Sequence, residues 1–154
     1  MDKVLVLGLG NTLQTDEGIG VHVVHHLQNN NYFPDAIYVD GGTHSFRLSE
    51  LIENNSHLIV IDTAELYSEP GSVAVFKNHE MDDFVANGAK SSAHEIGLKD
   101  MLSVALLQNR LPEERALIGI QPARFGWGCE PSGQVAAAIP QVVDQVKIIM
   151  EGWR

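Results

Sequence analysis

Short apolar runs alternate with amphipathic segments along this chain. Continuous apolar runs are typical of strands buried on both faces, and they occur at residues 4–7, 36–39, 58–61 and 117–120. A shorter strand is expected at a sheet edge, at residues 72–76. Apolar residues at helical spacing predict helices at residues 21–30, 46–54, 95–108 and 135–150, with a short helical turn at 81–85. Pro140 is expected to divide or kink the last helix.

This alternation of elements predicts the fold class. Strands that alternate with helices form parallel sheets covered on both sides, so we expect an α/β protein. The predicted architecture is a single three-layer domain spanning residues 1–154. Its core would be a twisted, mostly parallel sheet of about five strands with helices on both faces. A chain of 154 residues is long enough to bury a sizeable core.

The segment 8–20, which reads GLGNTLQTDEGIG, connects the first predicted strand to the first predicted helix. It carries two adjacent acids, Asp16 and Glu17, at the carboxyl end of a strand, where open α/β sheets place their sites. Two interpretations stay open from the residues alone. The acids either cap the helix through its dipole, or they form a cation or catalytic site.

A nucleotide site is the weaker interpretation of the same segment. Gly8 and Gly10 begin a dinucleotide fingerprint, but Leu13 stands where the third glycine should be. Two carboxylates at the helix N-terminus would also repel a pyrophosphate.

Two further predicted strands end in acids, and a histidine precedes a predicted helix. Asp40 either stabilises a turn or belongs to a site, and Asp62 either caps a helix or belongs to the same site. His94 follows the segment 87–92, which we expect to be mobile. A helix N-terminus would lower the pKa of the imidazole and favour the neutral form that binds metal. The alternative for His94 is a capping or surface role.

Other candidate residues favour structural interpretations. His22, His25 and His26 have spacings that suit a pair of metal ligands, but the apolar stripe beside them favours a solvated flank. Cys129 is interpreted as an inert thiol rather than a nucleophile. The irregular, aromatic segment 127–132 is a candidate for selecting the substrate.

Composition limits the classes of partner. The 20 acidic and 10 basic residues give a formal charge of −10, which argues against nucleic acid and membrane surfaces. Cations, metal centres and basic protein segments are compatible with this charge, which also serves solubility. The single cysteine excludes an intramolecular disulfide and suits a reducing compartment. With neither a secretory signal nor a membrane-spanning run, a cytoplasmic location is expected.

The segment 8–20 matches every fixed position of G-x-G-N-x-L-x-x-D-[DE]-x-x-G, and in this it resembles the [NiFe]-hydrogenase maturation endopeptidases. Three later pieces resemble the same family in order and spacing. They are DGGT at 40–43, HLIVID ending at Asp62, and SSAHEIGL around His94.

The resemblance implies an endopeptidase that removes the C-terminal extension of the hydrogenase large-subunit precursor after nickel insertion. The family's metal-binding positions correspond to Glu17, Asp62 and His94. Such a set leaves coordination positions open and suits Ni²⁺, with Zn²⁺ or Mn²⁺ as substitutes. The nickel is expected to be held by the substrate, and the chain is expected to act as a monomer.

Two mechanisms follow from this implied site. In one, the cation polarises the scissile carbonyl or activates a bound water. In the other, the metal only positions the substrate and a carboxylate acts as general base, with Asp16 and Asp40 as candidates. The rival functions are a nickel-sensing or chaperone module that binds the large subunit without cutting it, and a nucleotide-binding domain. The GxSxG and HExxH motifs of serine and zinc peptidases are absent.

Overall fold

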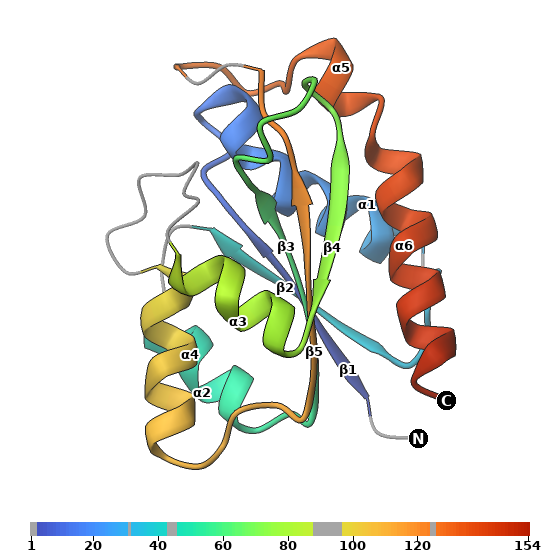
Figure 1. Ribbon diagram of the computed structural model, residues 1–154. Helices are drawn as coiled ribbons and strands as arrows, with labels where there is room; N and C mark the ends of the chain where they lie inside the picture. The colour runs from blue at the N-terminus through green and yellow to red at the C-terminus, as the bar shows by residue number, and fades with distance from the viewer. Residues whose placement is uncertain (1–2, 31, 43–45, 88–96, 124–125) are drawn as a thin grey trace.

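The protein forms a twisted sheet between two layers of helices (Figure 1). The computed structural model describes residues 3–30, 32–42, 46–87, 97–123 and 126–154. In this part of the chain the sheet has five strands in the order β2-β1-β3-β5-β4. The strands are β1 Val4–Leu9, β2 Ala36–Gly42, β3 His57–Thr63, β4 Val73–Lys77 and β5 Glu114–Ile120. All neighbours are parallel except β4, which runs antiparallel to β5.

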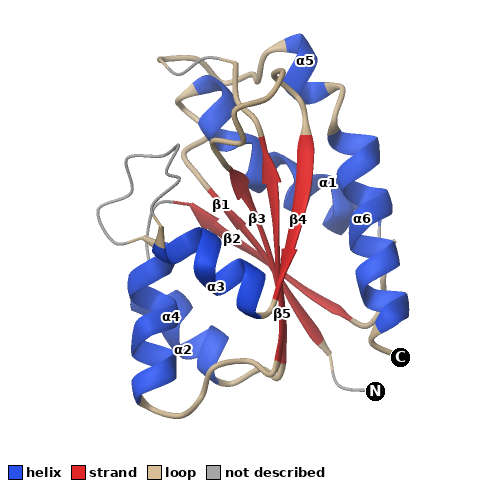
Figure 2. Ribbon diagram, viewed as in Figure 1, coloured by secondary structure: helices blue, strands red, loops and turns tan. Residues whose placement is uncertain are grey.

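Helices cover both faces of the sheet, as Figure 2 shows. Alternate residues of the strands point to opposite faces, so they build two separate apolar clusters. One cluster includes α1 Ile19–Asn30 and α6 Ile139–Gly152. The other includes α2 Phe46–Glu53, α3 His79–Ala86 and α4 Leu98–Leu107. The short elements η1 Thr15–Gly18 and α5 Gly133–Ala136 complete the described elements, and this architecture confirms the predicted α/β class.

The strand predictions hold for the centre of the sheet and fail at one edge. Every residue of β1 and β3 is buried except His57, as the apolar runs predict. The segment 36–39 was predicted as a buried strand, and this is wrong because β2 is an edge strand with mostly half-buried or exposed residues. β4 lies at the opposite edge, as predicted.

Several helix boundaries differ from those predicted. The turn expected at 81–85 is a two-turn helix, α3. The helix predicted to start at Glu95 instead begins at Leu98, with Gly97 in extended conformation as its N-cap. Pro140 lies in the first turn of α6, where proline costs no hydrogen bond, so the predicted division between α5 and α6 is confirmed. No described helix is both long and apolar enough to cross a bilayer.

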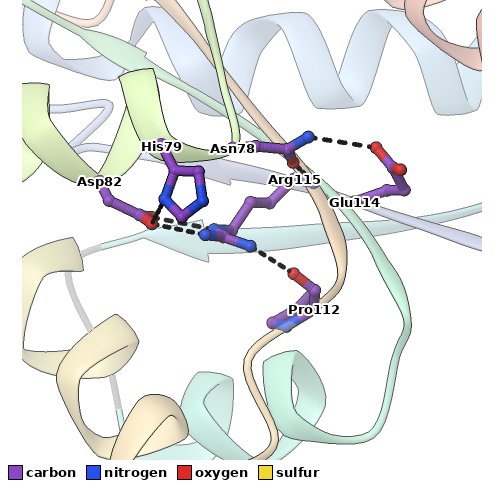
Figure 3. Close-up of polar contacts among 6 residues, drawn as sticks. All are labelled: Asn78, His79, Asp82, Pro112, Glu114 and Arg115. Atoms are coloured by element: carbon purple, nitrogen blue, oxygen red, sulfur yellow. Dashed lines mark hydrogen bonds and ion pairs between the residues drawn. The ribbon is translucent and has the colours of Figure 1, made fainter.

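A buried arginine anchors α3 at the amino end of β5 (Figure 3). The Arg115 guanidinium donates two hydrogen bonds to the Asp82 carboxylate and one to the Pro112 carbonyl. The Asn78 side chain accepts from the Arg115 backbone N–H at 3.0 Å, which joins the start of α3 to the sheet. Bidentate arginine pairs of this kind fix orientation as well as adding energy. The start of α3 is therefore held from two sides.

Glycines allow the segment 10–20 to lie directly on the carboxyl ends of the central strands. A Cβ atom on Gly20 would collide with the backbone oxygens of Leu9 and Ile61. Gly10 has φ +124°, and a Cβ there would collide with the Glu17 carbonyl. The glycine pattern of the segment therefore serves backbone approach, and the nucleotide interpretation is not needed to explain it.

We expect Gly20→Ala to destabilise the protein although alanine is the better helix former. The added methyl must displace strand backbone, and overpacking of this kind costs roughly 1–3 kcal/mol. For a chain of this size the melting temperature should fall by about 5 °C or more. Gly133→Ala is the matched control, because a Cβ there meets nothing within 4 Å and should leave the melting temperature nearly unchanged. Equal melting temperatures for the two variants would contradict the close approach.

Candidate active site

Two buried acids lie together at the carboxyl end of the central strands. Glu17 belongs to η1, which follows β1, and Asp62 is the next-to-last residue of β3. Their residues are only 5% and 8% exposed. Loss of water raises the pKa of Glu17 above its usual value. The sequence prediction that these two strand ends share one edge is thus realised in the fold.

The charge of Glu17 acts on Asp62. Burial raises the pKa of Asp62 to about 7, and the Glu17 carboxylate adds to this rise. The Thr63 backbone N–H donates to Asp62 Oδ1 at 2.8 Å and works in the opposite direction without cancelling the shift. Burial thus disfavours the charged form of both acids, and perturbed carboxyl groups of this kind are typical of functional sites.

Asp40 lies at the same edge of the sheet but on the other face. The register pairs Asp40 and Ile61 with the same residue of β1, Gly8, so strand positions 40 and 62 are about 10 Å apart. Residues 36 and 38 of β2 pack with the α1 and α6 cluster, and Asp40 continues that alternation. Its carboxylate accordingly pairs with His25 of α1 at 3.0 Å. Residues 58 and 60 of β3 pack with the α2, α3 and α4 cluster, which gives Asp62 the opposite direction.

Asp16 is fully buried and holds a distant segment of the chain. Its Oδ2 accepts hydrogen bonds from the Ala123 N–H at 2.8 Å and the Ser132 hydroxyl at 3.0 Å. Its Oδ1 accepts from the Ser132 N–H at 2.6 Å. Both carboxylate oxygens therefore face backbone and hydroxyl donors. This arrangement favours a positioning role for Asp16 over the role of general base.

The two segments that Asp16 joins also share backbone hydrogen bonds. The Thr15 N–H donates to the Gly128 carbonyl at 2.9 Å, and the Gly128 N–H donates to the Leu13 carbonyl at 2.9 Å. Thr15 has φ +47°, an uncommon and strained conformation for a β-branched residue. Strain immediately before the acids of a candidate site is consistent with a functional constraint on this turn.

His94 and the rest of the segment 88–96 lie outside the described residues, as does most of the segment 87–92 predicted to be mobile. The ends of this connection are described: Asn87 closes α3 and Gly97 precedes α4. Both helices belong to the layer toward which Asp62 points. Within the described ranges, no group of three or more His, Cys, Asp or Glu residues is placed to hold a metal ion.

The remaining candidates have mixed outcomes. His25 is exposed, as expected for a solvated flank, but His22 is half-buried and its Nε2 atom has no hydrogen-bond partner among the described residues. The expectation of a solvated flank is therefore wrong for His22. Cys129 is an exposed free thiol.

Sequence reasoning missed one contact at the candidate site, between Ser132 and Asp16. Ser132 precedes α5 and therefore has the sequence position of a helix cap. Its hydroxyl instead donates to Asp16, and no side-chain hydrogen bond caps α5. The two residues are 116 positions apart, a separation at which no local pattern connects them.

Comparison with known proteins identifies the family of this chain. The family model for hydrogenase maturation protease matches residues 21–148. The Hydrogenase 2 maturation protease of Escherichia coli (strain K12) is 33% identical over 146 residues, 94% of this chain and 88% of that protein. HupD, a hydrogenase expression/formation protein of Rhizobium leguminosarum bv. viciae, is 32% identical over 98% of this chain and 75% of its own length.

Solved structures show the same fold. The hydrogenase maturating endopeptidase HybD from E. coli has a TM-score of 0.84 and 30% identity, covering 97% of this chain and 93% of that one. The [NiFe] hydrogenase maturation protease HybD from Thermococcus kodakarensis has a TM-score of 0.79 and 29% identity, covering 96% and 98%. This chain therefore belongs to the hydrogenase maturation protease family.

Proposed function

We propose that this peptidase removes the C-terminal extension of a [NiFe]-hydrogenase large-subunit precursor after nickel has been inserted. We further propose that it recognises nickel held by the precursor through Glu17, Asp62 and His94. The observation that carries this proposal is the buried pair of acids, Glu17 and Asp62, whose pKa values burial raises. The relatives support the class of reaction, because one is named a hydrogenase 2 maturation protease and another a [NiFe] hydrogenase maturation protease.

The donor chemistry of the pair fits a substrate-borne cation. Each carboxylate loses its hydration on folding, and each would regain a favourable interaction when a divalent ion arrives. Carboxylate and imidazole ligands suit nickel, and a set of three leaves positions for ligands from the substrate. A site that is electrostatically unfavourable when empty would therefore bind a nickel-loaded precursor better than an unloaded one.

Nickel bound in this place would polarise a neighbouring peptide carbonyl as a Lewis acid. The chain's own part is proton transfer during hydrolysis. Water adds to the carbonyl carbon, the C–N bond breaks, and the proton that water loses reaches the leaving amine. We assign this transfer to the carboxylate oxygens of Glu17 and Asp62 that nickel would leave free, because these acids lie at the site and a bound cation would keep them ionised and able to accept a proton.

Asp16 and Asp40 are the alternative general bases, and their surroundings favour other roles. Asp16 accepts three hydrogen bonds from residues 123 and 132, which leaves it poorly placed to take a proton from water. Asp40 pairs with His25 on the opposite face of the sheet. The non-enzymatic alternative, a nickel-sensing or chaperone module, predicts binding of the precursor without a change in its mass.

The first prediction concerns the mass of the precursor. Incubation with the wild-type protein should release a C-terminal peptide from nickel-loaded precursor only. Glu17→Gln, Asp62→Asn and His94→Ala should each slow this release by roughly 100-fold, the scale for loss of one stabilising group in an active site. Intact-protein mass spectrometry over time measures the rate.

Glu69→Gln is the matched control, because it makes the same chemical change at an exposed position. It should process the precursor at the wild-type rate. Binding without mass change by the wild-type protein would support the chaperone function, and release from nickel-free precursor would contradict nickel recognition.

The second prediction concerns the pH dependence of stability in metal-free protein. Folding raises the pKa of Asp62 from about 4 to about 7, so between these values the folded state binds more protons than the unfolded state. The free energy of unfolding should therefore fall as pH rises from 4 to 7. Asp62→Asn removes this penalty and should be the more stable protein at pH 8, by up to about 4 kcal/mol.

Urea unfolding at several pH values, in the presence of a chelator, measures this difference. Asp144→Asn is the control, because it makes the same chemical change at an exposed position. If the stability of the Asp62→Asn protein followed the wild-type pH profile, the pKa of Asp62 would not be raised by folding.

A further inference from the structure

Two large apolar side chains stand exposed beside the candidate site. Leu13 is 53% exposed and Trp127 is 83% exposed. They are 114 positions apart in the sequence, yet the Gly128 N–H donates to the Leu13 carbonyl at 2.9 Å. The residues following each of them form a short parallel bridge, between Gln14 and Gly128. Backbone hydrogen bonds therefore hold the segments of Leu13 and Trp127 together.

The exposure of two large apolar side chains next to the candidate site needs an explanation. Tryptophan is rarely left in water by chance, and it is among the residues most enriched where binding energy concentrates in interfaces. Leu13 precedes Glu17 by four residues, and the intervening Thr15 is buried against Gly128. Leu13 therefore belongs to the same short segment as Glu17, which we assign to the reaction.

Asp16 fixes the geometry of this surface. Its carboxylate binds Ala123 and Ser132, which lie on either side of Trp127 in the chain. The same residue is covalently joined to Glu17. One buried side chain therefore ties the position of the Trp127 segment to the position of the acid pair.

We propose that the segments 11–16 and 126–132 form the docking surface for an extended piece of the precursor that flanks the scissile bond. Leu13 and Trp127 contact its apolar side chains, and Asp16 is a positioning residue that acts through the Trp127 segment. This inference rests on the proposed function, because that function requires a polypeptide to lie across Glu17 and Asp62. The exposed Leu13 and Trp127 side chains favour an apolar piece, and the net charge of −10 together with the exposed Glu130 on the same segment disfavours an acidic one.

Steady-state processing of nickel-loaded precursor tests the surface. Trp127→Ala should raise KM by about tenfold or more and Leu13→Ala by about threefold, with kcat within twofold of wild type. Leu107→Ala is the matched control and should leave KM unchanged, because Leu107 is an exposed leucine at the end of α4, outside the proposed surface. Unchanged KM values for both site variants would overturn the docking surface.

A double-mutant cycle tests the role of Asp16. Asp16→Asn and Ser132→Ala should each raise KM, and their effects should largely disappear in a Trp127→Ala background if Asp16 acts through that segment. A purely structural role would lower the melting temperature but multiply KM by the same factor in both backgrounds, which would overturn the positioning role. Ser132→Ala keeps this test valid if Asp16→Asn does not fold.

Binding without cleavage separates this inference from the proposed function. In a Trp153→Phe background Trp127 is the only tryptophan, since the sequence has two. With 5-fluorotryptophan incorporated into this chain alone, the ¹⁹F resonance of Trp127 should shift when nickel-loaded precursor is added. Absence of processing by the wild-type protein would reject the proposed function alone, whereas processing with neither a resonance shift nor a KM change would reject the docking surface alone.

Discussion

The close approach of the segment 10–20 to the ends of β1 and β3 is the constraint on which the site depends. Gly20 packs against the Leu9 and Ile61 carbonyls, so α1 starts directly over the sheet. The turn before it is thereby pressed between the strand ends and the segment 123–132. Acids that would be solvated in a looser turn are buried here. The close packing of this turn against strand backbone thus determines the electrostatic environment of the acids.

Burial has opposite consequences for two neighbouring acids. Asp16 exchanges water for hydrogen bonds from two backbone N–H groups and a hydroxyl, and such donors stabilise a carboxylate. Glu17 is also buried, but there the loss of water dominates and raises its pKa. One residue therefore holds the architecture, while the next lies where burial disfavours its ionised form. Adjacent positions in one motif acquire different roles because their surroundings differ.

The fold was largely predictable because its main signals are local. Continuous apolar runs identify β1 and β3, and a proline in the first turn separates α5 from α6. β2 was assigned as buried because the run of residues 36–39 resembles that of a central strand. Its place at the edge depends on which strands pair, and that is decided by the whole chain. Contacts such as Arg115 with Asp82 escape prediction for the same reason.

The sequence also predicted that several strand ends would share one edge of the sheet. Side chains at that edge can point to either face of the sheet. Alternation along β2 and β3 sends Asp40 toward α1 and Asp62 toward the layer of α2, α3 and α4. Asp40 therefore pairs with His25 on one face, whereas Asp62 points to the other face and is affected by the charge of Glu17.

The same alternation bears on His94, although its own position lies outside the described residues. Arg115 fixes the start of α3 through Asp82, and α4 packs in the same apolar cluster. The described residues Asn87 and Gly97 flank α3 and α4, and both helices belong to the layer toward which Asp62 points. Asp40 points to the opposite face, which gives a physical reason to leave it out of a set that includes Asp62.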